Sequence, residues 1–343
     1  MTLPTTMLGL ALKDDGFSRD TTGQALTDLS PYVELKEVPV PTPRAGQALI
    51  KVARAAVNPS DVAFIKGLYG QSRKKGTPAG FEGTGTVVSG DTPLIGKRVS
   101  FFGSISGTWA EYALTDAAGL IPVRDDLNDQ DAAGLIVNPI TAMAMFDIAK
   151  TDAEAGGADS FIATAAGSQL GKFLISLGRD EGLPCVAVVR RSNLIEPLTN
   201  LGAAAVLATD AEDYATAMPE TLKTHAPRVM LDAVAGQVTA DLFFAMQQRA
   251  RWIGYGRLSL EPPTLTQMGQ FIFMDKRIEG FWLTNWLNTT PRDKIAKVVA
   301  ATQARFVEGS WKTDISATVP LENAMEALPA AYSEKDSKVL IAP

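Results

Sequence analysis

A run of small residues between a β-like and a helix-like segment has the spacing of a phosphate-binding turn. Residues 161–178 read FIATAAGSQLGKFLISLG, and Ala166, Ser168 and Gly171 hold the three places where a phosphate-binding turn needs small residues. Small residues let backbone N–H groups approach a pyrophosphate at the N-terminus of the following helix, and Gly167 adds conformational freedom. Taken alone, the pattern is equally typical of a tightly packed corner between strand and helix.

Two arginines, Arg190 and Arg191, stand at the end of the next β-like segment. They lie about twenty residues beyond the turn, where a domain that prefers NAD places an acidic side chain for the ribose hydroxyls. Guanidinium groups instead suit a 2′-phosphate, which they bind through paired hydrogen bonds. Turn and arginines together predict an NADPH site formed by Ala166, Gly167, Ser168, Gln169, Leu170, Gly171, Arg190 and Arg191.

Cysteine and histidine are too scarce for several common kinds of site. The chain has one cysteine, Cys185, and one histidine, His225. A disulfide framework is therefore impossible, and no zinc site can be assembled from Cys and His ligands. We predict no bound metal, a buried Cys185 within a strand, and His225 in a surface loop.

Composition and charge indicate a globular protein without a nucleic-acid surface. The 343 residues are 46% hydrophobic and 20% charged, with a net charge of −6. No basic run extends beyond residues 73–75, which disfavours a nucleic-acid surface. The first sixteen residues lack the basic start of a secretion signal, and no apolar run is long enough to span a membrane. We therefore expect a cytoplasmic protein with no membrane or nucleic-acid partner.

The elements that must position the turn change in character along the chain. Up to about residue 125, short β-like runs alternate with glycine and proline, which predicts a compact, barrel-like antiparallel domain. From about residue 130, helix-like and strand-like segments alternate, which predicts a doubly wound parallel sheet of five or six strands. In this part we expect one helix over 131–150 and a last strand over 277–284.

The C-terminal segment has a strand, helix and strand pattern that fits neither neighbouring stretch. We expect it to return to the first domain. The predicted domains are therefore residues 1–129 with 300–343, and an inserted nucleotide-binding domain over residues 130–299.

Several motifs resemble those of the medium-chain dehydrogenase/reductase superfamily, from about Val33 to the C-terminus. They are VNPSDVAFIKGLYG (57–70), GFEGTGTVVSG (80–90), GTWAEYALT (107–115), NPITA (138–142), GYGRLS (254–259) and GFWLTNW (280–286). The closest likeness is to the zinc-free branch, which comprises quinone oxidoreductases and mitochondrial-type 2-enoyl thioester reductases. The resemblance implies an α/β protein with a GroES-like β-barrel catalytic domain and a Rossmann NADP-binding domain.

The resemblance also implies roles for particular residues. Tyr69 matches the family's proton-donating tyrosine, and Asn58 would lie near the nicotinamide and the substrate. Read from the residues alone, Tyr69 is an ordinary loop aromatic and Asn58 a helix cap. Arg257 replaces a residue that is small in many relatives, which leaves the size of the substrate pocket open. Further cofactor contacts implied by the family are Asn138, Thr141, Tyr255, Gly256, Phe281, Trp282, Leu283 and Lys338.

Reduction of an α,β-unsaturated carbonyl without a metal needs a donor for the developing enolate and a proton for Cα. The leading prediction is an NADPH-dependent enzyme that reduces activated C=C bonds in 2-enoyl thioesters or enones. An NADPH:quinone oxidoreductase is the alternative, and a non-enzymatic NADPH-binding protein is a more distant one. Because the strand at 277–284 would leave an open sheet edge, we also expect a homodimer.

Overall fold

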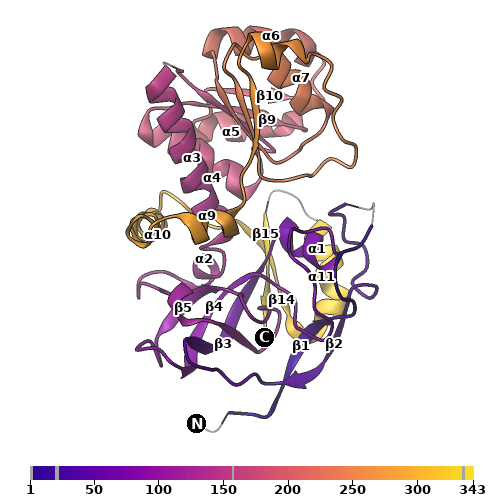
Figure 1. The fold of residues 1–343 in the computed structure, drawn as a ribbon, viewed down its shortest axis with the longest axis vertical. Coiled ribbons are helices and arrows are strands. Elements are labelled where there is room, and N and C mark those ends of the chain that lie inside the picture. Colours follow the sequence, from indigo (N-terminus) through magenta and orange to yellow (C-terminus); the bar gives the residue numbers. More distant parts are fainter. Residues whose placement is uncertain (1–2, 20–22, 157, 334–336) are drawn as a thin grey trace. The chain divides into compact units, whose positions relative to one another are not determined.

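The chain folds as two compact units in a computed structural model that describes residues 3–19, 23–156, 158–333 and 337–343 (Figure 1). The first unit comprises residues 1–137 and 301–343, and the second comprises residues 138–300. Residues 130–137 thus lie in the first unit, whereas the sequence prediction assigned them to the second.

A seven-stranded sheet forms the centre of the first unit. Its order is β14-β15-β3-β4-β5-β7, with β6 also paired to β3, and the pairing is antiparallel except between β14 and β15. The strands are β3 (Gln47–Val57), β4 (Glu82–Gly90), β5 (Arg98–Phe102), β6 (Tyr112–Asp116), β7 (Ile121–Pro122), β14 (Ile315–Pro320) and β15 (Lys338–Ala342). The long strand β3 lies in the region that the sequence predicts to be β-rich, where β-like runs alternate with glycine and proline.

A two-stranded sheet and short helices complete the first unit. Strands β1 (Thr6–Leu12) and β2 (Val33–Pro39) pair antiparallel. The helices are α1 (Pro59–Ile65), α2 (Asp129–Ala133) and α11 (Ala324–Ser333), and α10 (Arg292–Val307) leads into the unit from the second one. The core joins side chains from both ends of the chain, including Phe81, Trp109, Leu328 and Ile341. In Figure 1 the yellow C-terminal strands accordingly lie beside strands of the indigo N-terminal part.

The second unit is a six-stranded parallel sheet with the order β10-β9-β8-β11-β12-β13. This order is that of a dinucleotide-binding fold, in which the direction of winding reverses between the first and fourth strands, and it confirms the predicted fold class. The strands are β8 (Phe161–Thr164), β9 (Cys185–Val189), β10 (Ala205–Ala208), β11 (Val229–Asp232), β12 (Arg251–Gly254) and β13 (Arg277–Gly280). The helices are α3 (Val137–Gly156), α4 (Gln169–Glu181), α5 (Ile195–Leu201), α6 (Tyr214–His225), α7 (Gln237–Ala245), α8 (Gly269–Phe273) and α9 (Leu283–Thr289).

The single helix expected over 131–150 is wrong, because the structure has two helices, α2 and α3, there. The backbone N–H groups of Ile136 and Val137 donate to the carboxylate of Glu82 at 3.1 and 2.8 Å. These N–H groups would otherwise bond to carbonyls one turn earlier in a continuous helix. A buried side chain far away in the sequence therefore interrupts the helix.

The strand expected over 277–284 is also wrong in its second half. Strand β13 ends at Gly280, and α9 begins at Leu283. Backbone N–H of Trp286 donates to the carbonyl of Trp282, so the apolar run belongs to a helix start rather than to a strand. A short apolar run is compatible with either a strand or a helix, and pairing with a neighbouring strand decides which one forms.

Candidate active site

The turn between β8 and α4 has the close packing that a nucleotide loop requires. Its first residue, Ala165, adopts the left-handed conformation with φ 47°. Ser168 caps α4, since its hydroxyl accepts from the Gly171 N–H at 3.2 Å. A Cβ at Gly171 would lie 2.5 Å from Cα and O of Ala166, so only glycine fits there. Gly171 thus allows the helix to approach the turn closely, as in the third glycine position of a dinucleotide fingerprint.

The other residues predicted to bind the cofactor in the second unit follow the ends of parallel strands. Arg190 and Arg191 follow β9, with Arg190 exposed and Arg191 partly buried. Tyr255 and Gly256 follow β12, and residues 281–283 follow β13. Because the carboxyl ends of parallel strands share one edge of the sheet, these residues and the turn after β8 lie at a common edge.

One close contact tightens this carboxyl edge. A Cβ at Gly256 would lie 2.9 Å from the Ala233 carbonyl oxygen, so the loops after β11 and β12 are in close contact. The hydroxyl of Tyr255 is buried and has no hydrogen-bond partner among the described residues, and burial raises its pKa. Asn138 and Thr141 belong to the first turns of α3, with Thr141 buried and Asn138 partly buried.

Asp232, at the end of β11, is the fully buried carboxylate that holds this edge together. Oδ1 accepts from the Val234 N–H at 2.9 Å and from the Thr239 hydroxyl at 3.1 Å, and Oδ2 accepts from the Ala235 N–H and the Trp252 indole, both at 2.9 Å. The Thr164 hydroxyl, on the last residue of β8, is a fifth donor. Asp232 therefore connects the start of the nucleotide turn with the loop after β11.

In the first unit, the structure brings together two predicted site residues that are far apart in the sequence. Asn58 precedes α1, whose first residue is Pro59, and Lys338 is the first residue of β15. The Lys338 ammonium donates to Oδ1 of Asn58. Their exposed fractions are 1% and 4%, so both side chains are buried.

Two carboxylates complete this cluster. Glu82 Oε1 accepts from Nδ2 of Asn58 at 2.8 Å, and the Asp61 carboxylate accepts from the N–H groups of Asn58 and Phe81, each at 2.7 Å. Both carboxylates are fully buried. We call Asn58, Asp61, Glu82 and Lys338 the buried polar cluster. The amide of Asn58 is oriented by an acceptor at its nitrogen and a cation at its oxygen.

Burial changes the charge behaviour of the cluster. It raises the pKa of Asp61 to about 7, and the nearby Glu82 carboxylate adds to the rise while two backbone donors oppose it. Burial also lowers the pKa of Lys338 below its ordinary value, against the attraction of Glu82 and Asp61. Burial thus favours the uncharged forms of the Asp61 carboxyl and the Lys338 amine, while opposite charges within the cluster favour the charged forms.

Tyr69 lies in the same unit, in the loop that follows α1. It is partly buried, and its ring packs against Phe81 with 4.9 Å between ring centroids. Phe81 also donates its N–H to Asp61, so Tyr69 packs against a residue that is hydrogen-bonded to the buried polar cluster. The loop presents a phenol, which is a proton donor at neutral pH.

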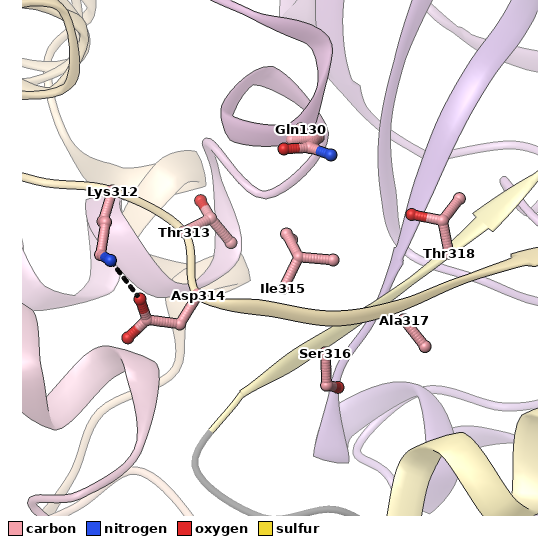
Figure 2. A pocket seen from close by; sticks show the side chains of 8 residues that line it. All are labelled: Gln130, Lys312, Thr313, Asp314, Ile315, Ser316, Ala317 and Thr318. Carbon is pink, nitrogen blue, oxygen red and sulfur yellow. Dashed lines mark ion pairs between the residues drawn. The ribbon is translucent and has the colours of Figure 1, made fainter.

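A surface depression lies elsewhere in the first unit. Figure 2 shows its lining side chains along β14 and the ion pair between Lys312 and Asp314. The depression has a volume of about 450 Å³, and the ion pair spans 3.3 Å. Its lining consists of Gln130 and residues 312–318, none of them a predicted site residue. It is an open, polar face of an edge strand, and the chemistry described above does not involve it.

Sequence reasoning did not single out Asp61, Glu82, Thr164 or Asp232. A signal existed for Asp232, because an acidic residue ends the buried strand VMLD. Asp61 stands three residues after a candidate helix cap, a spacing typical of helix starts. Glu82 lies within the motif GFEG but has no local signal, since its partners come from distant segments.

Neither metal ligands nor membrane helices emerge from the described part of the chain. Within the described residues, no three His, Cys, Asp or Glu side chains are grouped so as to hold a metal ion. Within the same ranges, the helices all fall short of the length and apolar character that crossing a membrane demands.

Known proteins resemble this chain in sequence and fold. Residues 44–125 match the alcohol dehydrogenase GroES-like domain. The mitochondrial enoyl-[acyl-carrier-protein] reductase of Rattus norvegicus is 28% identical over 316 residues, which cover 89% of this chain and 83% of the relative. A crystal structure of a Mesorhizobium loti protein, described as a candidate NADPH:quinone reductase, is 45% identical, covers both chains fully and has a TM-score of 0.95.

A third resemblance concerns the fold alone. The heterodimeric mitochondrial 2-enoyl thioester reductase of Candida tropicalis is 22% identical, covers 99% of this chain and all of its own, and has a TM-score of 0.78. The full-length match at 45% identity carries more weight, since its coverage is as complete and its sequence identity is about twice as high. This chain belongs to the medium-chain dehydrogenase/reductase superfamily, in the zinc-free branch that contains quinone oxidoreductases and 2-enoyl thioester reductases.

Proposed function

We propose that this protein is an NADPH-dependent, zinc-independent reductase of activated C=C bonds in 2-enoyl thioesters or enones. The observation that carries the cofactor assignment is the pair Arg190 and Arg191, which directly follows β9 in a sheet with the dinucleotide-binding strand order. The turn at residues 165–171 suits the pyrophosphate, because Gly171 leaves no room for a Cβ against Ala166. The arginines suit the 2′-phosphate.

In the proposed reaction, the cofactor supplies the hydride and the protein supplies the proton. When bound, NADPH supplies the hydride that adds to Cβ of the substrate. Tyr69 holds a proton on Oη and delivers it to Cα, directly or through a water that it orders, so that the C=C bond becomes saturated. Asn58, Asn138, Thr141, Tyr255, Gly256, Phe281, Trp282, Leu283 and Lys338 are proposed to contact cofactor or substrate.

A quinone reductase is the second candidate, and the 45% identical Mesorhizobium loti protein favours it by its description. Hydride transfer to an electron-poor ring depends less on a positioned acid than enoyl reduction does. The two candidates therefore make opposite predictions for a variant at Tyr69. We expect Tyr69→Phe to lower 2-enoyl thioester reduction about 100-fold while the affinity for NADPH is unchanged.

The deciding experiment offers crotonyl-CoA and benzoquinone in parallel to the purified enzyme and follows NADPH oxidation, with NADH as the control. Thioester turnover that prefers NADPH and needs Tyr69 supports the proposal. Turnover of quinone alone assigns the second function. Tight NADPH binding without any turnover points to a non-enzymatic role.

The cofactor preference has its own test. Replacing Arg190 and Arg191 by alanine removes two charged donors, each worth about 1.5–3 kcal/mol to a phosphate. We expect the dissociation constant for NADPH to rise at least tenfold while that for NADH stays constant. Lys223→Ala is the matched control, because this exposed lysine lies on α6, away from the end of β9.

We also propose that the protein is a homodimer that pairs through β13. All four residues of β13 are exposed in the single chain, and Ile278 is 45% exposed. Nearby in sequence, Ile272 and Phe273 are 75% and 85% exposed. Exposed apolar residues beside an open sheet edge are typical of an interface. Light scattering should give the mass of two chains, and Ile278→Lys should shift it towards one.

A further inference from the structure

We propose that Arg73 is a positioning residue for Tyr69, which deepens the function proposed above and rests on it. Arg73 is only 6% exposed although it lies in a loop. Its guanidinium donates to the carbonyl of Gly16 at 3.0 Å and to that of Ile65 at 2.9 Å. A buried arginine that binds two backbone carbonyls from separate segments acts as a fixed crosslink, because its planar donors allow few other arrangements.

The crosslink closes the short loop that contains Tyr69. Ile65 is the last residue of α1, so the Arg73 side chain reaches back across the loop to the point where it begins. Gly67, with φ 73°, lies directly under the guanidinium, since a Cβ there would be 2.8 Å from Cζ of Arg73. Tyr69 is thus held in a segment with a fixed start and a fixed end.

The N-terminal segment is the second side of this crosslink. Gly16 and Arg73 exchange backbone hydrogen bonds at 3.0 and 3.3 Å, and the Ser18 N–H donates to the Gly67 carbonyl at 2.9 Å. Asp14 lies 3.7 Å from the guanidinium but is 60% exposed, so this ion pair contributes little. The backbone carbonyls, rather than a carboxylate, therefore determine where Arg73 lies.

The consequence concerns how well the phenol is placed. A proton donor on a loop must be held in the geometry of the reaction, and a displacement of about 1 Å can cost about 100-fold in rate. The ring of Tyr69 packs on Phe81 on one side, and the crosslink fixes the loop backbone. Loss of the crosslink should therefore lower proton delivery, while the nucleotide turn and the arginine pair after β9, which lie in the second unit, are unaffected.

The test is a double-mutant cycle between Tyr69→Phe and Arg73→Lys in the full-length protein. Lysine keeps the charge but cannot bind both carbonyls in the planar arrangement of a guanidinium. We expect Arg73→Lys to lower kcat with crotonyl-CoA about 10- to 100-fold, with the KM for NADPH and the turnover of benzoquinone within twofold of wild type. If Arg73 acts through Tyr69, the double variant is no slower than Tyr69→Phe alone.

The control variant is Arg98→Lys. Arg98 lies in the same unit and donates to the carbonyls of Arg124 and Leu127 and to the carboxylate of Asp129, and these partners lie outside the Tyr69 loop. We expect its kcat to be unchanged. Multiplicative rate losses in the double variant, or equal losses with thioester and quinone, would overturn the positioning role. Full thioester turnover by Tyr69→Phe would instead remove Tyr69 from the proposed function, and that result is visible without any Arg73 variant.

Discussion

Glu82 in the first unit and Asp232 in the second are both fully buried carboxylates, but different parts of the chain satisfy them. Asp232 accepts two of its five hydrogen bonds from its own loop, and all five donors are neutral. Glu82 accepts from Asn58 and from the residues that begin α3, and the cation of Lys338 attracts it from the C-terminal strand. Asp232 therefore holds its own loop against elements of the same parallel-sheet unit, whereas Glu82 joins segments from the start, the middle and the C-terminal end of the chain.

The largest expected effect is from Asp232→Ala. Removal of the carboxylate leaves buried N–H groups of the loop after β11 and the Trp252 indole without acceptors. We expect a loss of roughly 4 to 5 kcal/mol in the free energy of unfolding, measured by urea denaturation. Asp241→Ala, at an exposed position of α7, is the control and should change stability little. A loss under 1 kcal/mol would show that the loop does not depend on Asp232.

The next largest effect is a pH dependence from Asp61. Its folded-state pKa of about 7 exceeds the ordinary value of 3.8, so the stabilisation is complete below pH 3.8 and is lost as the pH rises through 7. At about 1.4 kcal/mol per pKa unit, the total is at most about 4 kcal/mol. The stability advantage of wild type over Asp61→Asn should thus be larger at pH 5 than at pH 8. An advantage that grows with pH would mean that Asp61 is ionised throughout.

Glu82→Gln should have a smaller effect, of about 2 kcal/mol. The glutamine side chain has only one oxygen, so it cannot accept from both Asn58 and the N–H groups at the start of α3. One of these two sets of donors would then face the NH2 group of the glutamine. A double-mutant cycle with Lys338→Met should show coupling, because the two charges attract each other. Glu111→Gln is the matched control, since that carboxylate accepts a single backbone bond from Leu8 at 2.7 Å. Purely additive losses would contradict the joining role of Glu82.

The smallest expected effect is from Ser168→Ala at the start of α4. A lost N-cap typically costs about 1 kcal/mol. Asn128→Ala removes the equivalent cap of α2, where Oδ1 accepts from the Asp131 N–H at 2.8 Å. Because both caps are local, we expect similar thermal shifts in the two variants. A much larger loss for Ser168→Ala would mean that the turn depends on its cap beyond the helix start.

Much of the fold was predictable because its signals are local. Alternating strand-like and helix-like segments predicted the doubly wound sheet, and the small residues before α4 predicted its turn. The errors arose where two local structures were equally compatible with the residues. Residues 281–284 are compatible with a strand, but β13 ends at Gly280. The helix is interrupted between α2 and α3, where Glu82 accepts from the N–H groups of Ile136 and Val137.

The sequence by itself determined the chemistry that is available: one cysteine and one histidine, a turn of small residues, an arginine pair after a strand, and a tyrosine between glycines. Only the tertiary structure decided which of these residues meet. Asn58 and Lys338 are joined although 280 positions separate them, and Arg73 links the N-terminal segment to the end of α1. The physical reason is that a buried charge requires partners, and sheet pairing brings those partners from segments that no local pattern connects.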